Sequence, residues 1–120
     1  MAKKILLADK SIYSRWTLRD IFQGHGYTIV GEAKSGEEAL EQYEKLKPDV
    51  LVMDLSLSEP AVVAAIYDLR MKYPDVCILV SCGMGQRRGA VEALSSGARD
   101  FITRPYNERR VLQVVKKIIG

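Results

Sequence analysis

The chain has 120 residues, 48% hydrophobic and 28% charged, which suits one domain with its own core. Its apolar runs reach only five or six residues, too short for a membrane-spanning helix, and no signal peptide is expected. The net charge of +3 is uneven, because residues 86–120 hold eight basic and three acidic side chains, or +5, and the rest carries −2. This basic third is either a set of solvated helix faces or a docking face for an acidic partner.

Short apolar runs alternate with amphipathic stretches along the chain. In order, they predict a strand at 5–8, a helix at 11–23, a strand at 28–33, a helix at 36–46, a strand at 50–53, a helix at 61–73, a strand at 76–81, a helix at 87–96, a strand at 101–103 and a helix at 107–119. Cys77 and Cys82 are five residues apart on one predicted strand and therefore face opposite ways. We expect no disulfide between them and a reducing, cytoplasmic location.

Polar and helix-breaking residues mark the ends of these helices. The segment 24–26, Gly-His-Gly, stops the first helix. Ser35 and Glu38 have the spacing of a capping box, in which each side chain accepts a hydrogen bond from the other residue's amide. Pro48 prevents continuation of the second helix, and Asn107 is expected to cap the last one.

Five strand–helix units in succession predict an α/β fold. Continuous apolar strands that alternate with helices indicate a parallel sheet covered on both faces, here as a single domain over residues 1–120. Right-handed crossovers favour a doubly wound, flavodoxin-like arrangement with the strand order 2-1-3-4-5.

Polar residues follow four of the predicted strands where each strand ends. They are Asp9, Lys10, Asp54, Ser81, Cys82 and Arg104. Ligands of open α/β sheets bind at the carboxyl ends of the strands, so these side chains are expected to converge on one functional edge.

Several segments resemble the receiver domain of two-component response regulators, over the whole chain and most closely the stand-alone, chemotaxis-type receivers. The matching pieces are Lys-Ile-Leu-Leu-Ala-Asp at 4–9, Leu-Lys-Pro-Asp-Val-Leu-Val-Met-Asp at 46–54, Gly-Ala-Arg-Asp-Phe-Ile at 97–102, and the pair Arg104-Pro105. The resemblance implies that Asp54 accepts a phosphoryl group from a phosphohistidine. It also implies a Mg²⁺ ion held by Asp54 and an adjacent acidic pair, and a lysine that contacts the phosphoryl group. A Ser/Thr hydroxyl would bond to the same group, and this bond would be coupled to an aromatic residue on the last strand, which together form the family's conformational switch.

The chain departs from the family pattern around Asp54. Asp9 keeps the first acid of the pair, but Lys10 replaces the second acid, and Arg104 stands where the family has its lysine. Counting from Asp54 and from Arg104 places the switch hydroxyl position on Cys82; a register shifted by one residue would place it on Ser81. Phe101 matches the switch aromatic or is ordinary core, and Pro105 is a structural residue of a turn that suits a cis peptide.

The four charged side chains of this site sum to zero. Asp9 and Asp54 oppose Lys10 and Arg104, whereas the family's three carboxylates and one lysine give −2 before metal. Mg²⁺ binding is therefore expected to be weak or absent. One hypothesis is that the Lys10 ammonium occupies the metal's space and pairs with Asp54 or Asp9, and Asp54 then mainly anchors a salt bridge to Lys10 or Arg104. A competing hypothesis keeps weak phosphorylation.

Two surfaces are candidates for partner binding. Ile12, Tyr13 and Trp16 lie off the apolar face of the first helix, either as a docking patch or packed on a neighbouring loop. In the family this helix meets the histidine kinase or phosphotransfer partner. The second surface comprises helix 87–96, strand 101–103 and helix 107–119, with Phe101, Tyr106 and Arg109, where the family contacts an effector or a second receiver.

The sequence therefore predicts a degenerate receiver that signals by binding other proteins. It is not expected to be an enzyme beyond self-phosphotransfer and autodephosphorylation at Asp54. The first alternative is an orthodox phosphoacceptor switch. The second is a nucleic-acid-binding module that uses the basic third, although no helix-turn-helix or stacking-aromatic signature supports it.

Overall fold

The computed structural model describes residues 2–57 and 59–120. Its five parallel strands form one sheet in the order β2-β1-β3-β4-β5, which confirms the predicted α/β fold. The strands are β1 (Lys4–Ala8), β2 (Thr28–Ala33), β3 (Val50–Asp54), β4 (Ile78–Cys82) and β5 (Asp100–Thr103). The helices are α1 (Ile12–Gln23), α2 (Gly36–Leu46), α3 (Glu59–Lys72), α4 (Arg87–Ser96) and α5 (Glu108–Ile119), with short 3₁₀ turns η1 (Leu55–Leu57) and η2 (Met84–Gln86) before α3 and α4.

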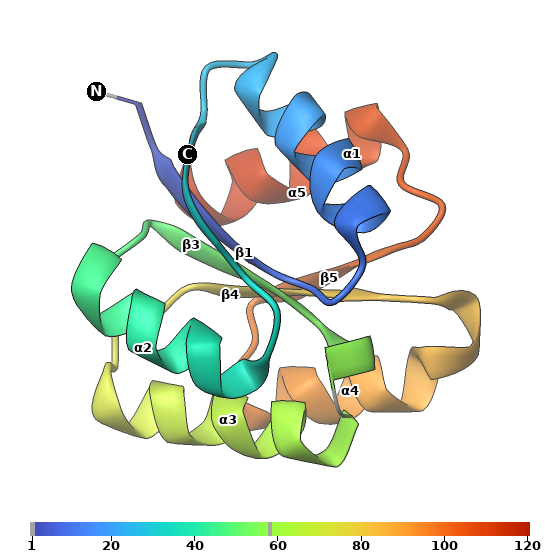
Figure 1. Ribbon diagram of the computed structural model, residues 1–120. Helices are drawn as coiled ribbons and strands as arrows, with labels where there is room; N and C mark the ends of the chain where they lie inside the picture. The colour runs from blue at the N-terminus through green and yellow to red at the C-terminus, as the bar shows by residue number, and fades with distance from the viewer. Residues whose placement is uncertain (1, 58) are drawn as a thin grey trace.

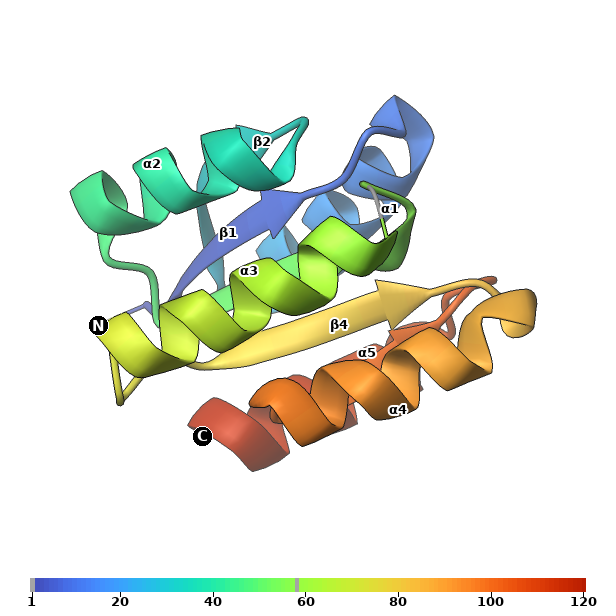
Figure 2. The ribbon, with the colours of Figure 1, turned by 90° about the horizontal axis from the view of Figure 1, so that it is seen from below.

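The sheet is the middle of three layers. Helices α1 and α5 cover one face, and α2, α3 and α4 cover the other (Figures 1 and 2). Strand β1 shows how the sequence divides the core, because successive residues of a strand point to opposite faces. Leu6 and Ala8 join the apolar cluster beneath α2–α4, and Ile5 and Leu7 join the cluster beneath α1 and α5.

The functional edge is built by the pairing of β3 and β4. The structure extends β3 through Asp54, one residue beyond the prediction, because Asp54 still pairs with Ser81. It also starts β4 at Ile78; Val76 belongs to a turn, and its N–H donates to the Tyr73 carbonyl at 2.9 Å. The longer β3 places Asp54 beside Ser81 at the carboxyl ends of the two strands.

The expected caps are present with one difference. The Asn107 side chain accepts from the Arg110 amide at 2.9 Å, and Ser35 Oγ accepts from the Glu38 amide at 3.0 Å. The reciprocal half of the capping box at Ser35 is wrong, since Glu38 Oε1 instead accepts from Gln42 Nε2 at 3.2 Å. A partner one turn further along α2 competes for the Glu38 carboxylate.

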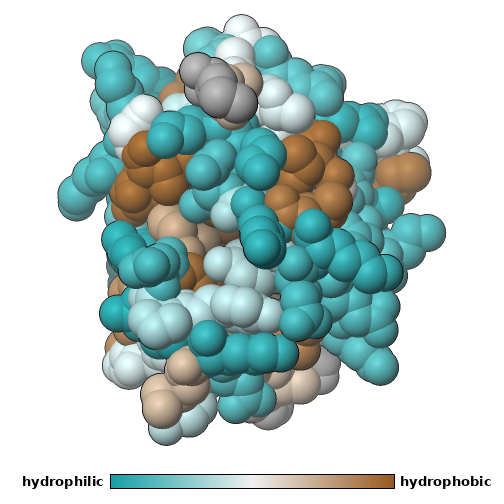
Figure 3. Space-filling view, turned by 90° about the vertical axis from the view of Figure 1, so that its left-hand side faces the viewer, coloured by the Kyte–Doolittle hydropathy of each residue, from teal (hydrophilic) through white to brown (hydrophobic). Residues whose placement is uncertain are grey.

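The two cysteines lie as the strand periodicity predicts. Cys77 packs in the cluster beneath α1 and α5, Cys82 packs in the opposite cluster, and neither forms a disulfide. Within residues 2–57 and 59–120, none of the helices is long and apolar enough to cross a membrane. The face where the strands begin is largely hydrophilic, with separate hydrophobic patches (Figure 3).

Gly97 provides a test of this backbone. It ends α4 with φ of +129°, and an added Cβ would lie 2.9 Å from Arg70 Cγ. We expect Gly97→Ala to lower the free energy of unfolding by roughly 1–3 kcal/mol, because an L side chain is strained in this conformation. Gly85→Ala is the matched control, since nothing lies within 4 Å of its added Cβ. Equal urea midpoints for the two variants would contradict the positive φ assigned to Gly97.

Candidate functional site

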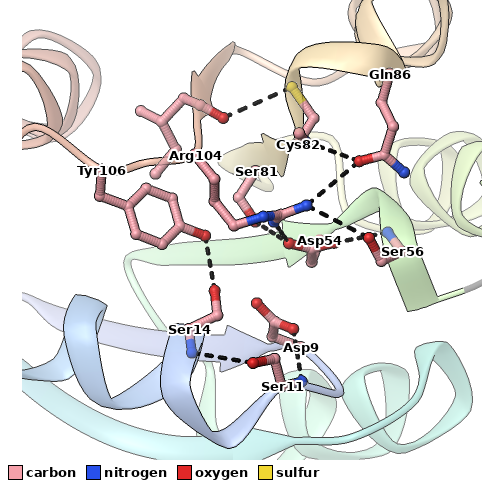
Figure 4. A network of polar contacts seen from close by, with 12 residues as sticks. Asp9, Ser11, Ser14, Asp54, Ser56, Ser81, Cys82, Gln86, Arg104 and Tyr106 are labelled. Atoms are coloured by element: carbon pink, nitrogen blue, oxygen red, sulfur yellow. Dashed lines mark hydrogen bonds and ion pairs between the residues drawn. The ribbon is translucent and has the colours of Figure 1, made fainter.

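Four strand ends bring the polar residues of the site together. Asp9 follows β1, Asp54 ends β3, Ser81 lies near the end of β4, and Arg104 follows β5 (Figure 4). Their side chains gather around the carboxylate of Asp54, as the positions of the strand ends predict.

The Asp54 carboxylate is fully buried and has donors on both oxygens. Oδ1 accepts from the Ser56 amide at 2.6 Å. Oδ2 accepts from Ser81 Oγ at 2.9 Å and from Arg104 Nη1, which also forms an ion pair with it. A buried carboxylate needs such charge and hydrogen-bond compensation to stay ionised in the fold.

Arg104 reaches Asp54 from the turn that follows β5. Its backbone N–H donates to the Cys82 carbonyl at 2.8 Å, and the Arg104–Pro105 peptide bond is cis. Nη2 lies 3.4 Å from both Ser56 Oγ and Gln86 Oε1. Burial opposes the charge, but hydrogen bonding with Tyr106 and attraction to Asp54 outweigh it and raise the pKa of the guanidinium. Arg104 is therefore a permanent cation at this carboxylate.

Asp9 has one satisfied oxygen and one orphaned oxygen. Oδ1 accepts from the Ser11 amide at 2.8 Å, whereas Oδ2 is buried without a partner among the described residues. Burial raises the pKa of Asp9, and the nearby Asp54 adds to this; the nearby Ser14 hydroxyl and the Ser11 amide oppose it. The backbone that carries this carboxylate is held in place, because Arg15 Nη1 donates to the Asp9 carbonyl at 2.6 Å.

Known proteins share the sequence pattern and the fold of this chain. The family profile described as "Response regulator receiver domain" matches residues 5–116. The chemotaxis protein CheY of Thermotoga maritima is 37% identical over 118 residues, 98% of each chain, and CheY of Bacillus subtilis is 31% identical over the full length of both. The crystal structure of the response regulator domain of T. maritima CheB superimposes with a TM-score of 0.81 at 29% identity, covering 99% of this chain and 97% of that one.

The chain belongs to the response regulator receiver family. It is thus a receiver domain of two-component signalling, in which receivers take part in phosphorelays with histidine kinases, phosphotransfer proteins and effectors. Receiver domains bind Mg²⁺ at their acidic pocket.

The structure corrects the prediction for Lys10. Lys10 is exposed, and it makes none of the ion pairs found among the described residues, so its predicted pairing with Asp54 or Asp9 is wrong. Arg104 takes that place. Asp9 points into the site at the end of β1, whereas Lys10, the next residue, extends its side chain to solvent.

Ser81 and Cys82, the two candidates for the switch position, lie differently in the structure. Ser81 rather than Cys82 places its side chain against Asp54, because the two residues pair directly across β3 and β4. The Cys82 thiol instead lies 3.7 Å from the Ile102 carbonyl on the other side of the strand. Phe101 is half-buried against the cluster that contains Cys82.

The donors of this receiver pocket do not make up a set for a divalent cation. In the part of the chain that the structure describes, no three His, Cys, Asp or Glu side chains gather closely enough to hold a metal. Asp9 Oδ2 is a suitable single ligand, but both oxygens of Asp54 already accept hydrogen bonds, one of them from a guanidinium. Mg²⁺ is usually held by one or two carboxylates with several waters, so one unengaged oxygen is a poor fit.

The two predicted partner surfaces are exposed to different extents. Tyr13 and Trp16 are 76% and 49% exposed on α1, and their rings meet edge to face at 6.4 Å. Arg109 is exposed on α5. Tyr106 is half-buried, and its hydroxyl lies 2.9 Å from Ser14 Oγ, so it ties the turn after β5 to α1.

Sequence reasoning missed several residues of the pocket. Gln86, in η2, contacts both Arg104 and the Gly83 amide, and Ser56 contacts Asp54 through its backbone. The Arg15 contact with the Asp9 carbonyl and the Ser14–Tyr106 bond were also missed. Ser14 had a signal, its place on the buried face of α1, whereas Ser56 and Gln86 lie in the 3₁₀ turns η1 and η2, whose conformations no motif marks.

The ion pair predicts a clear stability pattern. We expect Arg104→Met to lower the free energy of unfolding by roughly 3 kcal/mol, since it leaves the buried Asp54 charge without its partner. Asp54→Asn in the Arg104→Met background should recover most of this loss, because no buried charge then remains unpaired. Urea unfolding of the four proteins gives the coupling energy, and strictly additive effects would contradict the pairing.

Asp9 gives a prediction that depends on pH. Its pKa is raised above the ordinary 3.8, so ionised Asp9 destabilises the fold above that raised pKa. We therefore expect Asp9→Asn to raise the free energy of unfolding at pH 7 by about 1 kcal/mol. The gain should shrink as the pH falls toward 3.8, where wild-type Asp9 becomes protonated. Urea unfolding at pH 7 and pH 4.5 measures it, and a gain that grows at the lower pH would show that the pKa is not raised.

Proposed function

We propose that this receiver signals mainly by binding partner proteins and that Mg²⁺-dependent phosphorylation of Asp54 is impaired. The observation that carries the proposal is the contact of Arg104 with the Asp54 carboxylate. A metal ion would need an Asp54 oxygen that already has donors, and would find only one further carboxylate, Asp9, at the site. Mg²⁺ binding is therefore proposed to be weak or absent.

The charges of the site support the same proposal. Asp9 and Asp54 oppose Lys10 and Arg104, so four formal charges sum to zero and attract a divalent cation weakly. In this proposal Asp54 keeps the position of a phosphoacceptor, Ser81 supplies the hydroxyl beside it, and Arg104 neutralises it. The residues Lys10, Cys82 and Arg104 are the altered positions of the site.

Two surfaces are proposed to carry the binding. The first is the exposed apolar cluster of α1, Ile12, Tyr13 and Trp16, which lies beside the pocket and suits a histidine kinase or phosphotransfer protein. The second is the face formed by α4, β5 and α5, which carries Arg109 and suits an effector or a second receiver. Its basic charge would favour an acidic partner. The similarity to CheY suggests chemotaxis as the pathway, and two cysteines without a disulfide agree with the cytoplasm.

A second candidate function is an orthodox switch phosphorylated on Asp54. The hydrogen bond from Ser81 Oγ to Asp54 Oδ2 favours it, because a hydroxyl at that distance could bond to a phosphoryl group on the carboxylate. In that case Arg104 would move from the carboxylate to the phosphoryl oxygens, as a guanidinium binds both kinds of group.

Treatment with acetyl phosphate distinguishes the two candidates. We expect intact mass spectrometry to show at most a minor phosphoryl adduct, with a yield that millimolar Mg²⁺ does not raise over magnesium-free buffer. Asp54→Asn is the control that removes any adduct on this residue. A nearly complete, Mg²⁺-dependent adduct that Asp54→Asn abolishes would establish the orthodox switch and contradict the proposal.

A further inference from the structure

A groove lies between α2 and α3, apart from the Asp54 pocket. Its larger hollow has a volume of about 630 Å³. A second hollow of about 220 Å³ continues it along the two helices, because both are lined by Glu44, Lys72 and Tyr73. Half-buried tyrosines line the larger hollow, where the rings of Tyr43 and Tyr73 meet at 5.0 Å. The groove therefore combines apolar surface with charged side chains.

The rim of this groove is acidic. Four acidic and two basic side chains line the two hollows, which gives −2, and all of them are exposed: Glu41, Glu44, Asp68, Asp75, Lys47 and Lys72. Glu37 is also exposed on α2, and it shares one helix face with Glu41 and Glu44 at the spacing i, i+4, i+7. The negative charge thus forms a stripe along α2 beside the groove.

The groove already holds one cation of the chain itself. Lys72 Nζ lies 5.5 Å from the centroid of the Tyr73 ring and 3.6 Å from Glu44 Oε1. The Lys72 and Glu44 side chains are 64% and 65% exposed, so solvent screens the pair and holds it weakly. A tyrosine face beside a carboxylate attracts cations, and arginine stacks on such a ring more readily than lysine. The groove therefore suits a segment that brings further basic side chains.

The chain carries such a segment on α5, over the opposite face of the sheet (Figure 1). The solvent side of α5 holds four basic residues and one uncharged residue, all exposed: Arg109, Arg110, Gln113, Lys116 and Lys117. They span about 12 Å of helix at a rise of about 1.5 Å per residue. Leu112, half-buried one turn before Lys116, adds apolar surface at the edge of this basic stripe.

Like charges decide how two copies of the chain could meet. A symmetric contact through α5 would bring two basic stripes together, and one through α2 would bring two acidic stripes together. A contact of α5 with the α2–α3 groove of another copy instead opposes unlike charges, and is heterologous. Because α2 and α5 cover opposite faces of the sheet, a chain cannot fill its own groove (Figure 1).

We propose that the α2–α3 groove binds the basic stripe of α5 from a second copy of this chain, head to tail. The inference rests on the proposed function in one respect, since it takes the second receiver at the α4, β5 and α5 face to be another copy, and it narrows that face to α5. Exposed charges carry the contact, so it is expected to be weak and sensitive to salt.

Sedimentation equilibrium of the full chain, from micromolar to millimolar concentration, measures this association. At about 0.01 M salt, where the Debye length is about 30 Å, the average mass should rise above that of the monomer as the concentration increases. At about 1 M salt, where this length is about 3 Å, the chain should stay monomeric. A chain that stays monomeric at millimolar concentration and low salt would leave the groove to some other basic segment and overturn the inference.

Two charge-reversed variants test which surfaces meet. The groove variant carries Glu41→Lys and Glu44→Lys, and the helix variant carries Arg109→Glu and Arg110→Glu. We expect each variant alone to be monomeric at low salt, because like charges then face each other. An equimolar mixture should associate again, since each acidic surface meets a basic one. Circular dichroism checks that both variants keep the fold.

The matched control carries Arg87→Glu and Arg88→Glu. These exposed arginines lie in the first turn of α4, as Arg109 and Arg110 lie in the first turn of α5, so the control changes the net charge equally. Acidic residues are favoured in a first turn, which protects both helices. The control should associate as the wild type does.

Three further results would overturn the inference. A groove variant that still associates alone would show that the acidic rim is not in the contact. A mixture that stays monomeric would show that the two surfaces do not meet, and undiminished association at about 1 M salt would show that charge does not drive it. These results leave the proposed impairment of Asp54 phosphorylation unaffected, because the acetyl phosphate experiment tests it separately.

Discussion

The ion pair between Asp54 and Arg104 is the contact on which the rest of the site depends. It joins the end of β3 to the turn after β5 across the intervening strand β4, and it neutralises a fully buried carboxylate. Ser81, Ser56 and Gln86 all contact one or both members of the pair. A buried charge without such a partner is strongly destabilising, so the fold itself favours keeping the guanidinium in place.

This pair changes what the receiver fold does with its functional edge. The strand order places a carboxylate where open α/β sheets bind ligands. The positive charge beside this carboxylate comes from the protein's own Arg104 side chain. Stability and ligand binding then compete for the same oxygens of Asp54. That competition explains why a chain so close to chemotaxis receivers in sequence and fold is proposed to respond differently to Mg²⁺.

Much of the architecture could be predicted because it follows from periodicity. Apolar strands that alternate with amphipathic helices indicate a parallel sheet, and the family resemblance and right-handed crossovers favour its strand order. Asp54 ends an apolar run and was therefore expected at the functional edge. Tyr13 and Trp16 were predicted to be off the apolar face of α1, and both are exposed. Each of these predictions needed only the edge of the sheet or the face of the helix on which a residue lies, and none needed a side-chain conformation.

The details of the pocket could not be predicted from spacing. Lys10 and Arg104 both fall at the same edge, and only the direction of each side chain decides which one meets Asp54. The choice between Ser81 and Cys82 is a register shift of one residue, which reverses the face of a strand residue. Gln86 enters through the conformation of η2, which no motif in the sequence marks.

An experimental structure determined at high Mg²⁺ concentration tests the central claim most directly. The account predicts that Arg104 remains on the Asp54 carboxylate and that no metal ion lies between Asp9 and Asp54. A Mg²⁺ ion that bridges the two carboxylates, with the guanidinium displaced, would contradict it.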